Sequence, residues 1–181
     1  HRLQAHAGGG KGGITMSFKS EHLVSKAAGE QCTVAVHDSG LKIFLCPRKG
    51  YSTNYAIFGT HYGSIDTEFA LGDGELQRVP EGIAHFLEHK LFEGEDGDAF
   101  EKYAVTGASA NAYTSFDRTC YLFSCSDRFY ENLDILLDFV SSPYFTPETV
   151  NKEQGIIGQE IKMYEDVPDW RVLFNLFRIM Y

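Results

Sequence analysis

The segment from Pro80 to Gly94 reads PEGIAHFLEHKLFEG, and it decides how the rest of the sequence is interpreted. Proline suits the first turn of a helix, where its missing N–H would have no partner, so we expect a helix from Pro80 to about Glu93. On that helix His85 and His89 are four residues apart and project from one face. The apolar residues expected to pack the helix against a sheet are Ile83, Phe86 and Leu87.

Two imidazoles one helical turn apart suit a single zinc ion, whose bonds to histidine nitrogen are about 2.0–2.1 Å long. Glu88 is too close in sequence to His85 and His89 to be a third ligand, but it is well placed to hold a water molecule. Alone, the pair is also compatible with a solvated helix face. A third ligand from elsewhere in the chain would favour the metal.

A second helix offers that ligand. Thr146, Pro147 and Glu148 provide a cap, a first-turn proline and a first-turn acid, and the helix is expected to reach about Tyr164. Glu160 lies on this helix and would complete a set of two histidines and one glutamate, leaving a fourth position for water. Glu153 lies seven residues earlier, close to two turns, and so on the same stripe. We expect Glu153 to orient a ligand or to shape the local field, the alternative being a solvated charge.

The remaining pattern favours an α+β fold, a mainly antiparallel mixed sheet with helices packed against it. Apolar runs flanking Asp38–Gly40 predict a hairpin, and Asp66–Val79 is expected to be a loop. Further strands are expected at 55–62, 109–115 and 119–124. Further helices are expected at 98–106, closed by Gly107, from a cap at Ser126, and at 170–181.

Composition limits the partners and the compartment. The 181 residues carry a formal net charge of -9, which disfavours nucleic acids and anionic membranes. The four cysteines form no Cys-x-x-Cys pair, and we expect reduced thiols in a cytoplasm. Residues 1–15 are rich in glycine and are interpreted as a flexible leader or tag, with residues 16–181 forming one domain. Because the sequence stops inside an apolar helix, we expect a longer protein whose C-terminal half is missing.

The residues that could bind metal resemble those of the pitrilysin/insulinase family, the inverzincins. The family motif is HxxEH, followed some seventy to eighty residues later by a glutamate ligand with another glutamate seven before it; here the step from His89 to Glu160 is 71. The stretches FGTHYGSID (58–66) and NAYTS (111–115) resemble the family's central strand and its substrate-facing edge strand. The run EQGIIGQEIKMYEDVPDW (153–170) is similar to bacterial zinc peptidases of the family.

The resemblance implies a zinc endopeptidase in a bacterial cytoplasm. Family members close two homologous α+β halves around a peptide, and their C-terminal half supplies an arginine and a tyrosine that help to bind it. The implied zinc ligands are His85, His89 and Glu160. The implied catalytic residues are Glu88, as general base, and Glu153. The implied substrate-binding residues are Asn111, Ala112 and Thr114.

Three other interpretations stay open at this point. The chain could be a non-catalytic partner or scaffold subunit of the same fold, acting as a homodimer or beside a paralogous subunit. It could be a maturation peptidase for a modified peptide. It could also be a module in which zinc is structural, although structural sites usually have four protein ligands.

Overall fold

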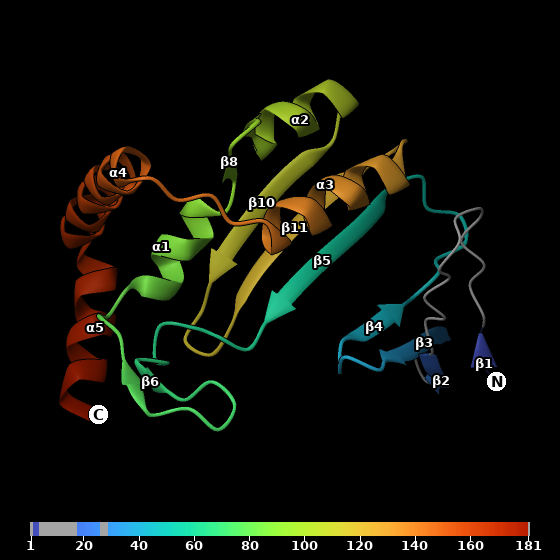
Figure 1. Cartoon of the computed structure of the whole chain (residues 1–181), viewed down its shortest axis with the longest axis horizontal. Helices are drawn as coiled ribbons and strands as arrows, with labels where there is room; N and C mark the ends of the chain where they lie inside the picture. The colour runs from blue at the N-terminus through green and yellow to red at the C-terminus, as the bar shows by residue number, and fades with distance from the viewer. Residues whose placement is uncertain (1, 4–17, 26–28, 181) are drawn as a thin grey trace. The chain divides into compact units, whose positions relative to one another are not determined.

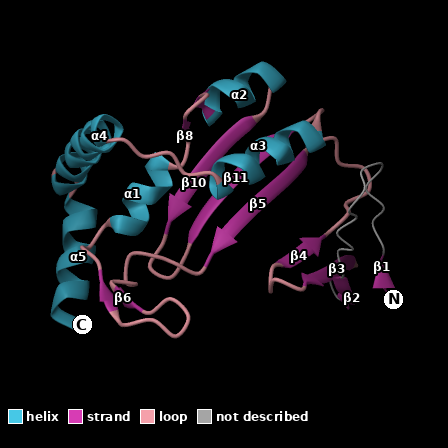
Figure 2. Ribbon diagram, viewed as in Figure 1, coloured by secondary structure: helices cyan, strands magenta, loops and turns pink. Residues whose placement is uncertain are grey.

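The structure is a computed structural model that describes residues 2–3, 18–25 and 29–180 (Figures 1 and 2). It divides into two compact units, His1–Tyr51 and Ser52–Tyr181, and each is described by itself. The leader expected at 1–15 lies outside the described residues, apart from Arg2 and Leu3. None of the described helices has the length and apolarity needed to span a lipid bilayer.

The first unit is a four-stranded antiparallel sheet in the order β1-β2-β3-β4. Its strands are β1 (Arg2–Leu3), β2 (Phe18–Ser25), β3 (Glu30–His37) and β4 (Lys42–Leu45). The predicted hairpin joins β3 to β4 and is confirmed. Its turn is closed by Gly40, which has φ 89° and donates its N–H to the His37 carbonyl at 2.9 Å.

The second unit contains a three-stranded antiparallel sheet, with helices on one face, in the order β10-β11-β5 (Figure 1). The sheet strands are β5 (Asn54–Thr60), β10 (Ser109–Thr114) and β11 (Thr119–Cys125). The short paired strands are β6 (Glu68–Phe69), β7 (Gln77–Arg78), β8 (Glu93–Gly94) and β9 (Gly97–Asp98). The helices are α1 (Ile83–Lys90), α2 (Ala99–Thr106), α3 (Phe129–Ser141), α4 (Pro147–Glu165) and α5 (Pro168–Met180). The antiparallel α+β expectation is confirmed.

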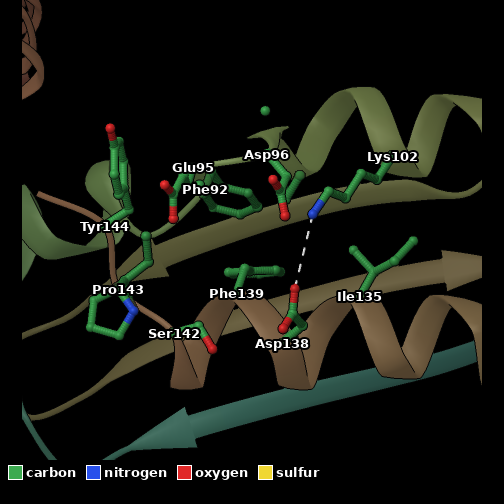
Figure 3. Close-up of a pocket in the computed structure, with 14 residues that line it drawn as sticks. Phe92, Glu95, Asp96, Lys102, Ile135, Asp138, Phe139, Ser142, Pro143 and Tyr144 are labelled. Carbon is green, nitrogen blue, oxygen red and sulfur yellow. Dashed lines mark ion pairs between the residues drawn. The ribbon is translucent and has the colours of Figure 1, made fainter.

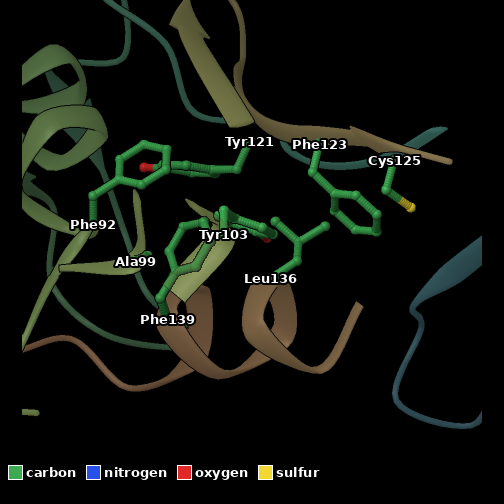
Figure 4. Close-up of a cluster of buried hydrophobic side chains, with 8 residues drawn as sticks. All are labelled: Phe92, Ala99, Tyr103, Tyr121, Phe123, Cys125, Leu136 and Phe139. Carbon is green, nitrogen blue, oxygen red and sulfur yellow. The ribbon is translucent and has the colours of Figure 1, made fainter. Parts of the chain in front are cut away.

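The core lies between β11 and the helices α2 and α3 (Figure 4). Alternate residues of β11 point to this side, including Tyr121 and Phe123, and α3 contributes Leu136 and Phe139. Phe123 is fully buried, and burial of one such side chain contributes roughly 1.5–3 kcal/mol. On the same sheet, α1 packs against β10 and β11.

Three helix starts differ from the sequence-based expectation. α5 begins at Pro168, two residues before the expected start at Trp170. α1 begins at Ile83, not at Pro80, because Gly82 has φ 86° and turns the chain immediately before the helix. α3 begins at Phe129, and its cap position is taken by Arg128 with φ 52° rather than by Ser126. The predicted caps of α2 and α4 are confirmed, with Gly107 closing α2 and Thr146 accepting a hydrogen bond at the start of α4.

The segment after β5 packs tightly on the turn between β10 and β11. Ser64 donates its N–H to the Ser115 carbonyl at 3.0 Å, and Ile65 donates to the Phe116 carbonyl at 3.1 Å. Gly63 is buried there, and a Cβ at this position would lie 2.4 Å from the Phe116 carbonyl oxygen. This close approach fixes the end of β10, which carries Thr114.

Candidate metal centre

The two histidines of α1 converge as the helical spacing predicts. His85 Nε2 and His89 Nε2 are 3.1 Å apart, and the rings meet edge to face with centroids 4.7 Å apart. Both side chains are partly buried, with 31% and 25% of their surface exposed. Two imidazole nitrogens at this distance repel each other through their lone pairs unless a proton or a cation is shared between them.

Glu160 brings a carboxylate oxygen to the same point from α4, which lies beside α1 (Figure 1). Its Oε2 is 3.3 Å from His89 Nε2 and 3.7 Å from His85 Nε2. Ligand bonds of about 2.0–2.1 Å in a tetrahedral zinc site place neighbouring ligand atoms about 3.3 Å apart. The three atoms therefore fit a zinc ion, and among the described residues they form the one group of His, Cys, Asp and Glu with such a spacing.

Glu153 supports one of these ligands from behind. Its Oε1 lies 2.9 Å from His89 Nδ1, and the residue is 8% exposed. An ionised carboxylate only accepts hydrogen bonds, so His89 must carry its proton on Nδ1. The lone pair of neutral His89 is then on Nε2, which faces the candidate metal position.

Glu88 projects toward the sheet. Its Oε2 accepts a hydrogen bond of 2.7 Å from the Thr114 hydroxyl on β10. Burial raises the pKa of Tyr121, and the negative charge of nearby Glu88 raises it further. One oxygen of Glu88 is thus held by the strand.

The expected substrate-binding residues lie on both faces of β10. Ala112 and Thr114 are half-buried on the side of the sheet that the helices cover, whereas Asn111 is exposed on the other side. The Asn111 side-chain oxygen accepts a hydrogen bond of 2.9 Å from the N–H of Ala112. The Thr114 hydroxyl contacts Glu88, an interaction that the sequence interpretation did not include.

A cavity of about 1210 Å³ opens beside the candidate metal centre. Its wall includes His85, Glu160 and Thr114, together with the aromatic side chains of Trp170 and Phe174 from α5. A second cavity, of about 300 Å³, lies between the β8–β9 hairpin and α3 and shares no lining residue with the first (Figure 3). Of these two cavities, the larger is the one that borders the candidate metal centre, because His85 and Glu160 line it.

Two residues beside the centre were missed by the sequence interpretation. Lys90 is fully buried, and its Nζ donates to Glu93 Oε2 at 2.9 Å. A signal was present, because Lys90 continues the predicted apolar stripe of Ile83 and Phe86 at helical spacing. Phe86 itself is only half-buried, and the deepest residues of α1 are Ala84 and Lys90.

Proteins of similar sequence and structure are named as zinc proteases or as peptidases. The chain is 57% identical over 144 residues to a Bacillus subtilis protein named "Uncharacterized zinc protease YmfH", covering 79% of this chain and 34% of that protein. It is 43% identical to an Alicyclobacillus acidocaldarius protein described as a "putative M16-like peptidase", whose crystal structure superimposes with a TM-score of 0.76, over 91% of this chain and 36% of that one. The chain thus spans about a third of the length of these relatives.

More distant comparisons agree on the fold. The crystal structure of pitrilysin superimposes with a TM-score of 0.65 at 19% identity, over 81% of this chain and 16% of that one. The family model described as "Insulinase (Peptidase family M16)" matches residues 74–181, which include both helices of the candidate metal centre. The chain therefore belongs to the insulinase family of peptidases, family M16.

Proposed function

We propose that the chain is the zinc-binding domain of the N-terminal half of a metalloendopeptidase, with His85, His89 and Glu160 as metal ligands. The observation that carries this proposal is the convergence of three ligand atoms, from helices far apart in sequence, at distances that suit tetrahedral zinc. A bound zinc ion would lower the pKa of a water toward about 7 and polarise a peptide carbonyl.

Glu88 is the proposed general base. It removes a proton from the attacking water and delivers it to the leaving amine. The Thr114 hydrogen bond of 2.7 Å holds one of its oxygens and leaves the other to meet the water. Glu153 fixes the ring of His89 in the orientation and tautomer that a ligand needs.

The peptide is proposed to bind along β10. Among the described strands, only β11 pairs with β10, so one edge of β10 has main-chain groups to offer. A peptide that adds to this edge is held by backbone hydrogen bonds, which tolerates many sequences. Asn111 and Ala112 are the proposed contacts on this strand, and Thr114 acts through Glu88.

We further propose that the active form includes a second, homologous half. The chain spans about a third of the length of its relatives, and the larger cavity lies beside the candidate metal centre. The second half would close over a peptide held at β10. A reducing bacterial cytoplasm is the proposed compartment, supported by four cysteines that are all free thiols.

The test is cleavage of a mixed peptide library by the full-length protein, with and without a chelator, beside its Glu88→Gln variant. We expect chelator-sensitive cleavage that is lost in the variant while zinc stays bound. Equal cleavage by Glu88→Gln would refute the general-base assignment. A folded, zinc-loaded wild type that cleaves nothing would refute the peptidase proposal and favour a scaffold role.

A further inference from the structure

We propose that Lys90, Glu93 and Lys152 form a positioning device that fixes α1 against α4 and thereby sets the zinc affinity of the candidate metal centre. The inference rests on the proposed function of that centre. It concerns residues outside the ligand set, because none of the three touches the point where the ligand atoms converge. The device acts through the helices that carry the ligands.

Lys90 is the buried end of this device. Its side chain has no exposed surface, and its ammonium group donates to Glu93 Oε2 at 2.9 Å. The Nζ also lies 5.8 Å from the ring centroids of Tyr144 and Phe145, within range of a cation–π interaction. Those rings stand in the connection immediately before α4, so the last residue of α1 is bound to the segment that leads into α4.

Glu93 joins the two helices. One of its oxygens accepts from Lys90, and the other lies 3.7 Å from Lys152 Nζ on α4. The hydrogen bond from Lys90, which is the largest cause, and the charges of both lysines lower the pKa of Glu93. The carboxylate is therefore held in its ionised form between two cations from different helices.

The sequence places each lysine beside a residue of the centre. Lys90 directly follows the ligand His89, and Lys152 directly precedes Glu153, which supports His89. A metal centre needs its ligand atoms held to within about 0.5 Å. A link that spans α1 and α4 at these two points limits the relative movement of His89 and Glu160.

An exposed pair elsewhere in the unit provides the matched control. Lys102 Nζ lies 3.9 Å from Asp138 Oδ2 at the smaller cavity, and the two side chains are 39% and 65% exposed (Figure 3). This pair links α2 to α3 and contacts neither ligand helix. Asp138→Asn therefore removes one lysine-paired carboxylate without touching the proposed device.

The experiment measures zinc affinity of the chain by competition with a chromophoric chelator, and thermal unfolding of the metal-free form. Glu93→Gln is expected to weaken zinc binding by at least about tenfold, the lower end of what loss of a supporting partner costs a metal site. Lys152→Gln is expected to weaken it by about threefold, since its ion pair is exposed. Lys152→Arg keeps the charge and is expected to restore wild-type affinity, and Asp138→Asn should leave affinity unchanged.

Each outcome decides the inference. Unchanged zinc affinity in folded Glu93→Gln and Lys152→Gln, even with a lower unfolding temperature, means that the device only stabilises the fold and overturns the proposal. If Glu93→Gln does not fold, the comparison of Lys152→Gln with Lys152→Arg gives the answer, because Lys152 is mostly exposed. Failure of the wild type to bind zinc would instead refute the metal centre itself.

Discussion

Replacement of Thr114 by valine separates the orientation of Glu88, the proposed general base, from the proposed binding of the metal. Valine has nearly the shape of threonine, so the half-buried site keeps its packing and loses only the hydroxyl that donates to Glu88 at 2.7 Å. A hydrogen bond to a charged group contributes about 1.5–3 kcal/mol. If that energy holds Glu88 in its working orientation, kcat falls by roughly 10- to 150-fold.

The assay is steady-state cleavage of a fluorogenic peptide by the full-length protein, together with zinc content and thermal unfolding. We expect KM and bound zinc to stay near wild type, and Thr114→Ser to recover most of the activity because it keeps the donor. Tyr113→Phe is the matched control, since Tyr113 precedes Thr114 on β10 and points to the opposite face. A Thr114→Val variant with kcat within about twofold of wild type would show that the hydrogen bond does not position Glu88.

Three further perturbations follow from the geometry. Glu153→Gln should weaken zinc binding by about 10- to 100-fold, measured by chelator competition, and unchanged affinity would remove its support of His89. Gly63→Ala should lower the free energy of unfolding in urea by about 1–3 kcal/mol, because its Cβ would lie 2.4 Å from the Phe116 carbonyl oxygen. Gly155→Ala should raise it by up to about 1 kcal/mol, because Gly155 lies on α4 with open space around the added Cβ. A Gly155→Ala variant less stable than Gly63→Ala would contradict this packing. The Glu93 carboxylate, whose pKa is lowered below its ordinary 4.5 by Lys90, contributes stability that is present above that value and lost as the pH falls through the lowered pKa. The stability difference between wild type and Glu93→Gln should therefore shrink as the pH falls below 4.5, and a difference that grows there would contradict this sign.

The residues of the candidate metal centre could be predicted from sequence because their positions follow helical geometry. His85 and His89 share a face at a spacing of four, and Glu153 and Glu160 share a stripe at a spacing of seven. The structure places three of these side chains at one point and the fourth behind His89. Helical periodicity was sufficient to predict that the members of each pair share a helix face. The family motif predicted that the two pairs belong to one site.

The arrangement on β10 could also have been read from periodicity. Asn111 and Thr114 are three residues apart, so on a strand they face opposite sides and cannot both line one face. What sequence alone could not supply was the partner of Thr114, because Glu88 is distant in sequence and comes from a different element. The start of α1 was placed too early because Gly82 has a positive φ, a conformation that a proline two residues before it does not indicate.

The burial of Lys90 shows where average preferences mislead. Lysine is almost never fully buried unless it is paired, so a lysine after a metal-ligand histidine is expected to be solvated. Here Glu93 and two aromatic rings compensate for the burial. Those partners come together only when the β8–β9 hairpin, which carries Glu93, and the segment with Tyr144 and Phe145 before α4 have folded.

Because the proposed ligands are divided between α1 and α4, the order of synthesis on the ribosome determines when the centre is complete. When α1 has been made, the nascent chain has only the histidine pair, and the third ligand follows 71 residues later. A pair of histidines holds zinc weakly, so the ion is captured for long times only once Glu160 has emerged and α4 has docked. If the centre binds zinc as proposed, metal loading therefore follows the docking of α4 on α1, and chains made without zinc would have these two helices less firmly joined.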